Sequence, residues 1–270
     1  MLNKGVDGKY SEAILRCRPI EWNGLTLFPI EVCQYEQFQT ARDGLMLSQQ
    51  TLPAKYISMR YLQALYAWDY DSMNAEGKKS GVFGRCINFL VLALRLPTAE
   101  DQTVPIRLFI DPENPHVLKS IEIQQGNSVA QITPKDFNAL RPLLAEQNGL
   151  ELPNAEHNAE LEEAEREITA ANAADLAIDF EDLLYSVSKE TGAGMDTLLE
   201  WPIRRFEKTQ RAIDRCVGFQ LSYLAEAQGC KFKNGNPYPT WKFDRIQGLS
   251  KALMSAGEFQ RNSAGAISAR

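Results

Sequence analysis

One stretch decides the fold class: LAIDFEDLLYSVSKETGAGMDTLLEWPIRRFEKTQRAIDRCVGFQLSYLAEAQGCKFKNGNPYPTWKFDR, residues Leu176–Arg245. It predicts a helix over about 174–190, a glycine break, a short helical turn and a long helix over about 202–228. Apolar residues recur in the long helix at steps of three, four or seven, which places them on one face: Ile203, Phe206, Ile213, Val217, Leu221 and Leu224. Pro202 suits the first turn of this helix, and Gly229 suits its end.

The helix before the break has its own apolar face, made of Leu176, Phe180, Leu183, Leu184 and Val187. Gly192 and Gly194 end it, and we expect Asp196 to cap the short turn at 197–200. A helix, a turn and a second helix also occur in DNA-binding proteins. An ordinary helical hairpin is far commoner, and we favour it here.

Basic residues form a stripe beside the apolar face of the long helix: Arg204, Lys208, Arg211 and Arg215, with Arg205 adjacent. Such a stripe is typical of a phosphate-binding surface. However, Glu200 and Glu207 each lie four residues before an arginine, the order that favours ion pairs along a helix. We therefore favour a solvated, charged helix face.

The N-terminal part predicts a β-hairpin followed by helices. Asn23-Gly24 is a strong two-residue turn signal, and we expect a hairpin over 12–30. Helices are predicted near 34–43, from Thr51 or Pro53 to Trp68, and over 81–95. Five aromatic residues in or beside the second of these helices are expected in the core or at its rim, because aromatic side chains bury large areas: Tyr56, Tyr61, Tyr66, Trp68 and Tyr70.

A small β module follows a polar, loop-like segment at 72–80. Strands are predicted at 106–110, 117–123 and 128–132, with Gln125-Gly126-Asn127 as a hairpin signal between the last two. Thr133, Pro134 and Asp136 then start a helix that ends near Gln147, with the threonine as its cap.

The chain therefore predicts an α+β fold that is mainly α-helical. We expect four parts: an N-terminal α+β domain over 1–149, with the β module at 104–147; an acidic linker or exposed helix over 150–173; a helical domain over 174–256; and a frayed tail over 257–270.

Charge is unevenly distributed along the chain. Residues 146–182 hold twelve acidic residues and one basic residue, whereas residues 200–251 hold ten basic and five acidic residues. These two regions are expected to attract each other within one molecule. The net charge of −6 argues against a surface built throughout to bind nucleic acid.

Composition indicates a soluble protein of a reducing compartment. The five cysteines are far apart in the sequence and odd in number, as expected of free thiols. The N-terminus lacks the continuous apolar core of a signal peptide. The most apolar run, Ile87 to Leu96, is too short to cross a bilayer, so we expect no membrane partner.

No catalytic motif accompanies the carboxylates of the sequence. One acidic cluster contains Asp179, Glu181 and Asp182, and another contains Glu160, Glu162 and Glu163. Neither has a histidine or a glycine-rich loop beside it, so solvated carboxylates are the favoured interpretation. We expect a protein that is not an enzyme and has no catalytic residues, cofactor or metal.

Two groups of segments carry a resemblance to a known family. The first group is Ile132–Phe137 and Glu146–Leu152. The second is Ser188–Gly192, Trp201–Phe206, Phe232–Gly235 and Trp241–Asp244. In these segments the sequence resembles tail-assembly proteins of phages and prophages of Gram-positive bacteria, often described as tail assembly chaperone-like.

The resemblance implies a non-enzymatic assembly factor in the bacterial host cytoplasm. Its partners would be the tape-measure protein or tube subunits, kept soluble until the tail polymerises. Candidate partner-binding residues are Trp201, Arg204, Arg205, Lys208, Tyr238 and Trp241. Two alternatives stay open: a tail or baseplate component retained in the virion, and a nucleic-acid-binding protein that uses the basic stripe. An oligomeric state also stays open.

Overall fold

The computed structural model describes residues 8–76, 80–97, 104–153, 179–232, 236 and 238–242. Its main helices are α1 (Ser11–Leu15), α2 (Tyr35–Met46), α3 (Ala54–Ile57), α4 (Tyr61–Glu76), α5 (Val82–Ala93), α6 (Pro134–Gln147), α8 (Phe180–Thr191), α9 (Met195–Leu199) and α10 (Ile203–Ala227). Its strands are β1 (Ile20–Trp22), β2 (Leu25–Leu27), β3 (Ile106–Ile110), β4 (Leu118–Gln125) and β5 (Ser128–Ile132).

The fold is α+β and mainly helical, as the sequence predicts. The chain divides into two compact units, residues 1–210 and 211–270, and the division falls within α10. The expected acidic segment at 150–173 lies outside the described residues from residue 154 onward, and so do residues 243–270.

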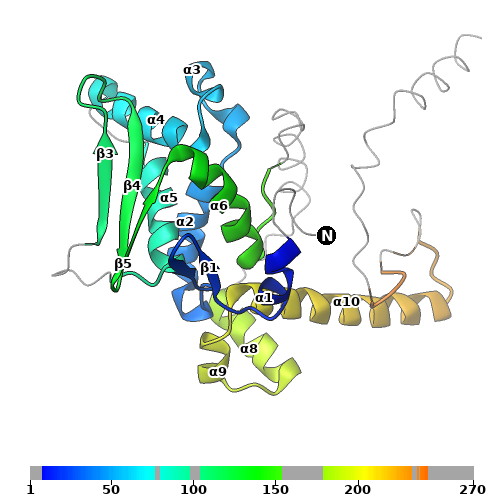
Figure 1. Cartoon of the computed structure of the whole chain (residues 1–270). Helices are drawn as coiled ribbons and strands as arrows, with labels where there is room; N and C mark the ends of the chain where they lie inside the picture. The colour runs from blue at the N-terminus through cyan, green and yellow to red at the C-terminus, as the bar shows by residue number, and fades with distance from the viewer. Residues whose placement is uncertain are drawn as a thin grey trace, which may run out of the picture. The chain divides into compact units, whose positions relative to one another are not determined.

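The three predicted strands form one antiparallel sheet in the order β3-β4-β5. Figure 1 shows this sheet standing beside α4 and α6, and both helices contact β4. Ile121 and Ile123 of β4 are fully buried, as expected for alternate residues on the inner face of a sheet. The helix after β5 begins as predicted, because Thr133 and Asp136 form a capping box.

The predicted hairpin is real but shorter than expected. It comprises β1 and β2, and both Asn23 and Gly24 at its turn have positive φ, as a two-residue primed turn requires. The prediction of strand from residue 12 is wrong, because residues 11–15 form α1. The backbone N–H of Arg16 donates to the carbonyl of Glu12, and their side chains pair at 3.1 Å.

The predicted helix from residue 51 or 53 to 68 is divided in two. It consists of α3 and α4 with a break at residues 58–60. The side-chain amide of Gln49 donates to the carbonyls of Ile57 and Met59 at this break. These contacts satisfy acceptors that a continuous helix would use itself. The predicted loop at 72–80 is also wrong in its first part, because α4 extends to Glu76.

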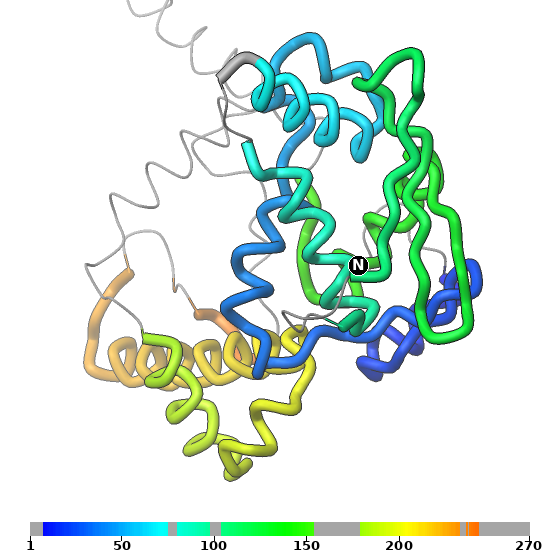
Figure 2. The backbone as a smooth tube through the Cα atoms, turned by 90° about the vertical axis from the view of Figure 1, so that its left-hand side faces the viewer, coloured from blue at the N-terminus to red at the C-terminus, as the bar shows by residue number. Residues whose placement is uncertain are grey.

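The core of the first unit is centred on α2 and α5, which run side by side in Figure 2. Their backbones meet at Gly44, where an added Cβ would lie 2.7 Å from the carbonyl carbon of Arg85. The predicted aromatic residues belong to this core or its rim: Tyr56, Tyr61 and Tyr66 are buried, and Trp68 and Tyr70 are half-buried.

Arg141 of α6 anchors the end of α2. Its guanidinium donates to the carbonyls of Leu45 (2.8 Å) and Leu47 (3.0 Å) and lies 3.5 Å from the ring centroid of Tyr61. Burial lowers the pKa of Arg141 and raises that of Tyr61. The arginine thus supplies donors to carbonyls at the C-terminal end of α2.

Helices α8 and α9 and the start of α10 complete the first unit. Gly192 ends α8 with a φ of 72°, as predicted, but Gly194 rather than Asp196 stands at the cap position of α9. Phe180 stacks on Tyr35 with ring centroids 4.0 Å apart. The N–H of Ile203 donates to the carbonyl of Ile30, which ties the start of α10 to the segment after the hairpin.

All five cysteines lie within the described part of the chain, and all are free thiols. Within that same part, no helix combines the length and apolar character needed to cross a bilayer.

Candidate functional site

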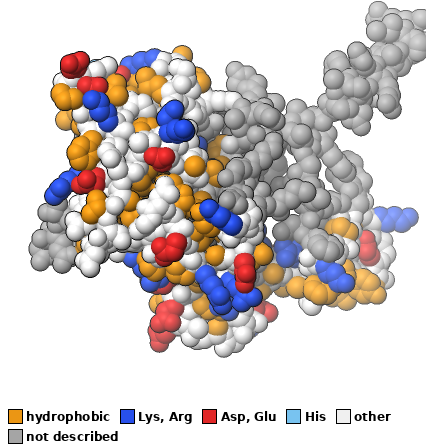
Figure 3. All heavy atoms as spheres, in the orientation of Figure 1, with side chains coloured by type: hydrophobic (Ala, Val, Ile, Leu, Met, Phe, Trp, Pro, Cys, Tyr) orange, Lys and Arg blue, Asp and Glu red, His pale blue; other side chains and the backbone are white. Residues whose placement is uncertain are grey.

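The second half of α10 exposes an apolar face, defined here as the distal face: Ile213, Val217, Leu221 and Leu224. Val217 is 45% exposed, Leu221 63% and Leu224 55%. Side chains three and four residues apart lie above one another on a helix, so these four form a continuous strip. Figure 3 shows hydrophobic side chains gathered along this part of α10.

The same face is buried at the start of the helix. Ile203 and Phe206 are each 1% exposed or less and belong to the core of the first unit. The predicted apolar face of the long helix is therefore present over its whole length, but only its first two members are core residues. Exposed apolar patches with polar surroundings often mark interaction surfaces.

An aromatic segment packs against α10 at Gly218 in the second unit. The ring of Tyr238 packs on Gly218, where an added Cβ would lie 2.8 Å from three ring atoms. The backbone N–H of Tyr238 donates to the side chain of Asn236 at 2.8 Å. Trp241 is 51% exposed, and the ammonium of Lys242 lies 5.7 Å from its ring centroid. Of the two aromatic residues, Trp241 offers the more open anchor.

Trp201 and Arg205 lie together, as their proximity in sequence suggests. The guanidinium carbon of Arg205 is 3.9 Å from the ring centroid of Trp201, and Trp201 is half-buried. The carbonyl of Trp201 accepts from the N–H of Val32 at 2.9 Å. The backbone of Trp201 is thus held in place shortly before α10 begins, and its ring makes a cation–π contact with Arg205.

Arg204 has a structural partner that the sequence did not reveal. Its guanidinium donates to Glu146 Oε1 at 3.0 Å and also to the backbone carbonyl of Glu146. The Arg204 and Glu146 side chains are only 13% and 10% exposed. Removing one partner would leave a largely buried charge, so this pair joins the end of α6 to the start of α10.

The predicted basic stripe is consequently not a uniform surface. The Arg204 side chain forms an ion pair with Glu146, whereas the Lys208 side chain is exposed. At about 100° per residue, the stripe lies on the opposite side of α10 from the distal face, so the expectation that it lies beside the apolar face is wrong. A partner helix on the distal face would therefore not meet the stripe.

A second exposed apolar group lies on the edge strand β3, and it consists of Leu108, Phe109 and Ile110. A bulge between Phe109 and Ile110 disturbs the register with β4. The exposed Arg107 on the same strand pairs with Glu122 at 3.5 Å. Bulges and charged side chains are features that discourage a further strand from pairing with an edge.

One titratable cluster surrounds Asp71 of α4. Its carboxylate accepts from Lys55 Nζ (2.6 Å) and from the hydroxyl of Tyr56 (2.6 Å), and it lies 2.7 Å from His116 Nδ1. The hydrogen bonds from Lys55 and Tyr56 lower the pKa of Asp71. Through these contacts the cluster ties α3, α4 and the loop before β4 together.

The described residues contain no group of three or more histidine, cysteine, aspartate or glutamate side chains placed to hold a metal ion. Comparison with protein-family models, curated proteins and solved structures finds no match to this chain. The candidate function therefore rests on the geometry above and on the resemblance described from the sequence.

Proposed function

We propose that this chain is a non-enzymatic assembly factor that binds other proteins through the distal face of α10. The supporting observation is the exposure of Val217, Leu221 and Leu224 along one strip of helix. An amphipathic partner helix could cover this strip with its own apolar face. Trp241, which is 51% exposed, would supply an aromatic anchor, because tryptophan is among the side chains that often contribute strongly to binding.

The resemblance gives this surface a biological setting, again as a proposal. The partner would be a tape-measure protein or a tube subunit of a phage tail, held soluble before polymerisation in the host cytoplasm. A long helical tail protein with an apolar seam would match a helical strip in shape and polarity. Retention in the virion as a tail or baseplate part is the alternative.

The experiment is a pull-down with the tagged chain from cells that express the neighbouring tail genes, followed by mass spectrometry. We expect recovery of a long helical tail protein by the wild-type chain. The double substitution Leu221→Gln and Leu224→Gln removes apolar area but keeps good helix formers. It should weaken binding by roughly 30- to 100-fold, equivalent to about 2–3 kcal/mol of lost apolar contact.

Glu226→Gln is the matched control, because it introduces the same side chain at an exposed position on the other side of α10. Equal loss of binding in the control would contradict a role for the distal face. Purified particles supply the second readout: an assembly factor is absent from them. Stable presence of the chain in particles would replace this proposal by the virion component.

A further inference from the structure

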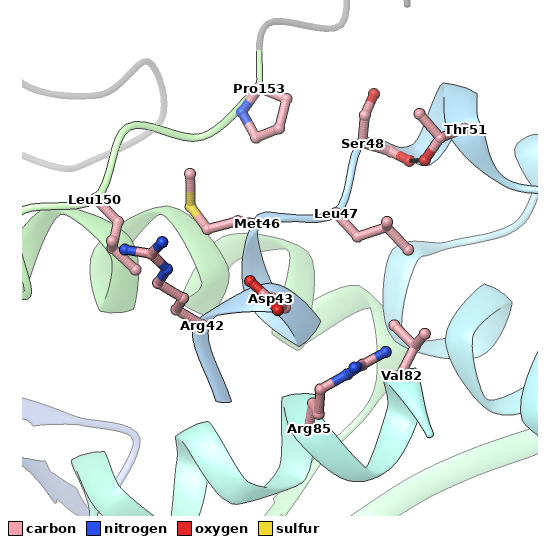
Figure 4. Close-up of a pocket in the computed structure, with 10 residues that line it drawn as sticks. All are labelled: Arg42, Asp43, Met46, Leu47, Ser48, Thr51, Val82, Arg85, Leu150 and Pro153. Carbon is pink, nitrogen blue, oxygen red and sulfur yellow. Dashed lines mark hydrogen bonds between the residues drawn. The ribbon is translucent and has the colours of Figure 1, made fainter. Parts of the chain in front are cut away.

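A pocket of about 690 Å³ lies in the first unit at the C-terminal end of α2. Figure 4 shows its walls, which come from α2, the residues that follow α2, the start of α5 and the segment after α6. Its polar side chains are Arg42, Asp43, Ser48, Thr51 and Arg85. The remaining lining residues are apolar, so the pocket combines two cationic groups with a hydrophobic wall.

The two arginines have no ion pair or hydrogen bond from their side chains within the described part of the chain. The Nε atom of Arg85 is buried and lacks a hydrogen-bond partner there. That nitrogen is enclosed by protein atoms, so an acceptor in the pocket would have to use the other nitrogens of the guanidinium.

The close contact of α2 with α5 fixes the position of Arg85. A Cβ at Gly44 would lie 2.9 Å from the Cβ of Arg85, so the first atoms of that side chain are held against the α2 backbone. The carbonyls just beyond, at Leu45 and Leu47, are held by Arg141. The pocket is therefore built on rigid elements, which favours specific binding.

We propose that this pocket binds the carboxylate of an acidic peptide segment from a partner protein. A guanidinium presents parallel N–H donors that match the two oxygens of a carboxylate. The apolar wall, including Val82 and Leu150, would receive an apolar side chain next to the acidic residue. The site is independent of the distal face and of the assembly role proposed above.

Asp43 is the reason for choosing a peptide over a phosphate chain. Its carboxylate lines the same pocket and would repel a phosphate group, which carries up to two negative charges, more strongly than it would repel a single carboxylate. A peptide offers backbone N–H donors as well as carboxylates, so Asp43 can accept a hydrogen bond from it. The pocket thus presents both signs of charge, and a peptide has groups complementary to each.

The test uses NMR of the purified full-length chain and follows the Nε–H resonances of the arginines. The probe is the blocked peptide Glu-Leu-Glu-Glu, and the comparison peptide is Gln-Leu-Gln-Gln. We expect the acidic probe alone to shift the Arg42 and Arg85 resonances to saturation. Arg42→Gln should weaken binding about 10-fold, because it removes charge-assisted hydrogen bonds. Asp43→Asn should tighten binding about 2- to 5-fold by removing like charge.

Arg107→Gln on β3 is the matched control, because it removes an exposed arginine of the same unit far from the pocket in sequence. If this control weakens binding as much as Arg42→Gln, the attraction is non-specific and the proposal fails. It also fails if the glutamine peptide produces equal shifts. Saturable shifts with inorganic phosphate, but none with the acidic peptide, would instead make the pocket a phosphate site.

Discussion

The side chain of Gln125 binds the β1–β2 hairpin to the rest of the first unit, and removing it tests this contact directly. Its Oε1 accepts from the N–H of Thr26 at 2.7 Å, and its Nε2 donates to the carbonyls of Thr26 and Leu94 at 2.8 Å each. A single amide therefore acts as a neighbouring strand would, pairing with both backbone groups of one residue of β2. Two-stranded hairpins are marginal on their own, so such contacts should matter.

The substitution Gln125→Ala removes three hydrogen bonds. At about 1 kcal/mol each, the free energy of unfolding should fall by roughly 3 kcal/mol, since the backbone groups are partly buried. For a unit of this size the melting temperature should fall by about 6–12 °C. The assay is thermal and urea unfolding followed by circular dichroism. Hydrogen exchange at the amide of Thr26 gives a local readout.

The neighbouring residue supplies a matched control. Gln124 is exposed, and its side chain makes one long contact of 3.4 Å with the carbonyl of Gly126. Gln124→Ala should therefore change stability by no more than about 0.5 kcal/mol. If Gln125→Ala is equally mild, or if both variants lose the same stability, the reasoning about strand mimicry is wrong.

A charge variant sharpens the same prediction. In Gln125→Glu, an oxygen would replace the donor that now faces the carbonyls of Thr26 and Leu94. Repulsion should raise the pKa of the introduced carboxyl in the folded state above its ordinary value of about 4.3. The variant should therefore be near wild type when the carboxyl is protonated and lose stability as pH rises through that range. A loss that does not depend on pH would refute the proposed contact.

Three further predictions concern other parts of the first unit. Gly44→Ala should cost about 3 kcal/mol or more in urea unfolding, because its Cβ would overlap the α5 backbone, and a near wild-type midpoint would contradict this. The hydrogen bond from Lys55 lowers the pKa of Asp71, so the wild-type protein should be more stable than Asp71→Asn above about pH 4. This difference in the free energy of unfolding should shrink as pH falls through the lowered pKa. A difference that does not change with pH would argue against the pair. In native thiol labelling the exposed Cys33 should react readily, whereas Cys86, fully buried with its pKa raised to about 12, should react at least about 10³-fold more slowly unless denaturant is added.

The sequence predicts the elements that local signals define. The turn at Asn23-Gly24, the capping box that starts at Thr133 and the left-handed Gly192 depend only on neighbouring residues, and each is found where expected. The division of α3 from α4 depends instead on Gln49, whose amide reaches the carbonyls at the break. No local sequence pattern indicates that contact, so the sequence predicts one continuous helix.

The candidate sites show the same limit more strongly. The partner of Arg204 is Glu146, 58 residues earlier, and helical spacing around Arg204 gives no sign of it. The pocket arginines Arg42 and Arg85 were missed because they belong to no motif and lie far apart in the chain. What brings them to one pocket is the packing of α2 on α5 at Gly44. A glycine within a helical pattern was the available signal, since such residues often mark a close approach of backbones.

The long helix explains why apolar periodicity alone cannot separate a core from a binding surface. Phe206 and Leu224 lie on the same face of α10 and contribute to the same repeat, yet Phe206 is buried and Leu224 is 55% exposed. Burial in the core and burial by a partner draw on the same driving force, so both select the same spacing of apolar residues. The repeat therefore specifies a helix with an apolar face along its whole length, and burial of that face against another surface is favourable. Ile203 and Phe206 at its beginning are buried in the core of the first unit, and the distal face is the part that we propose a partner covers.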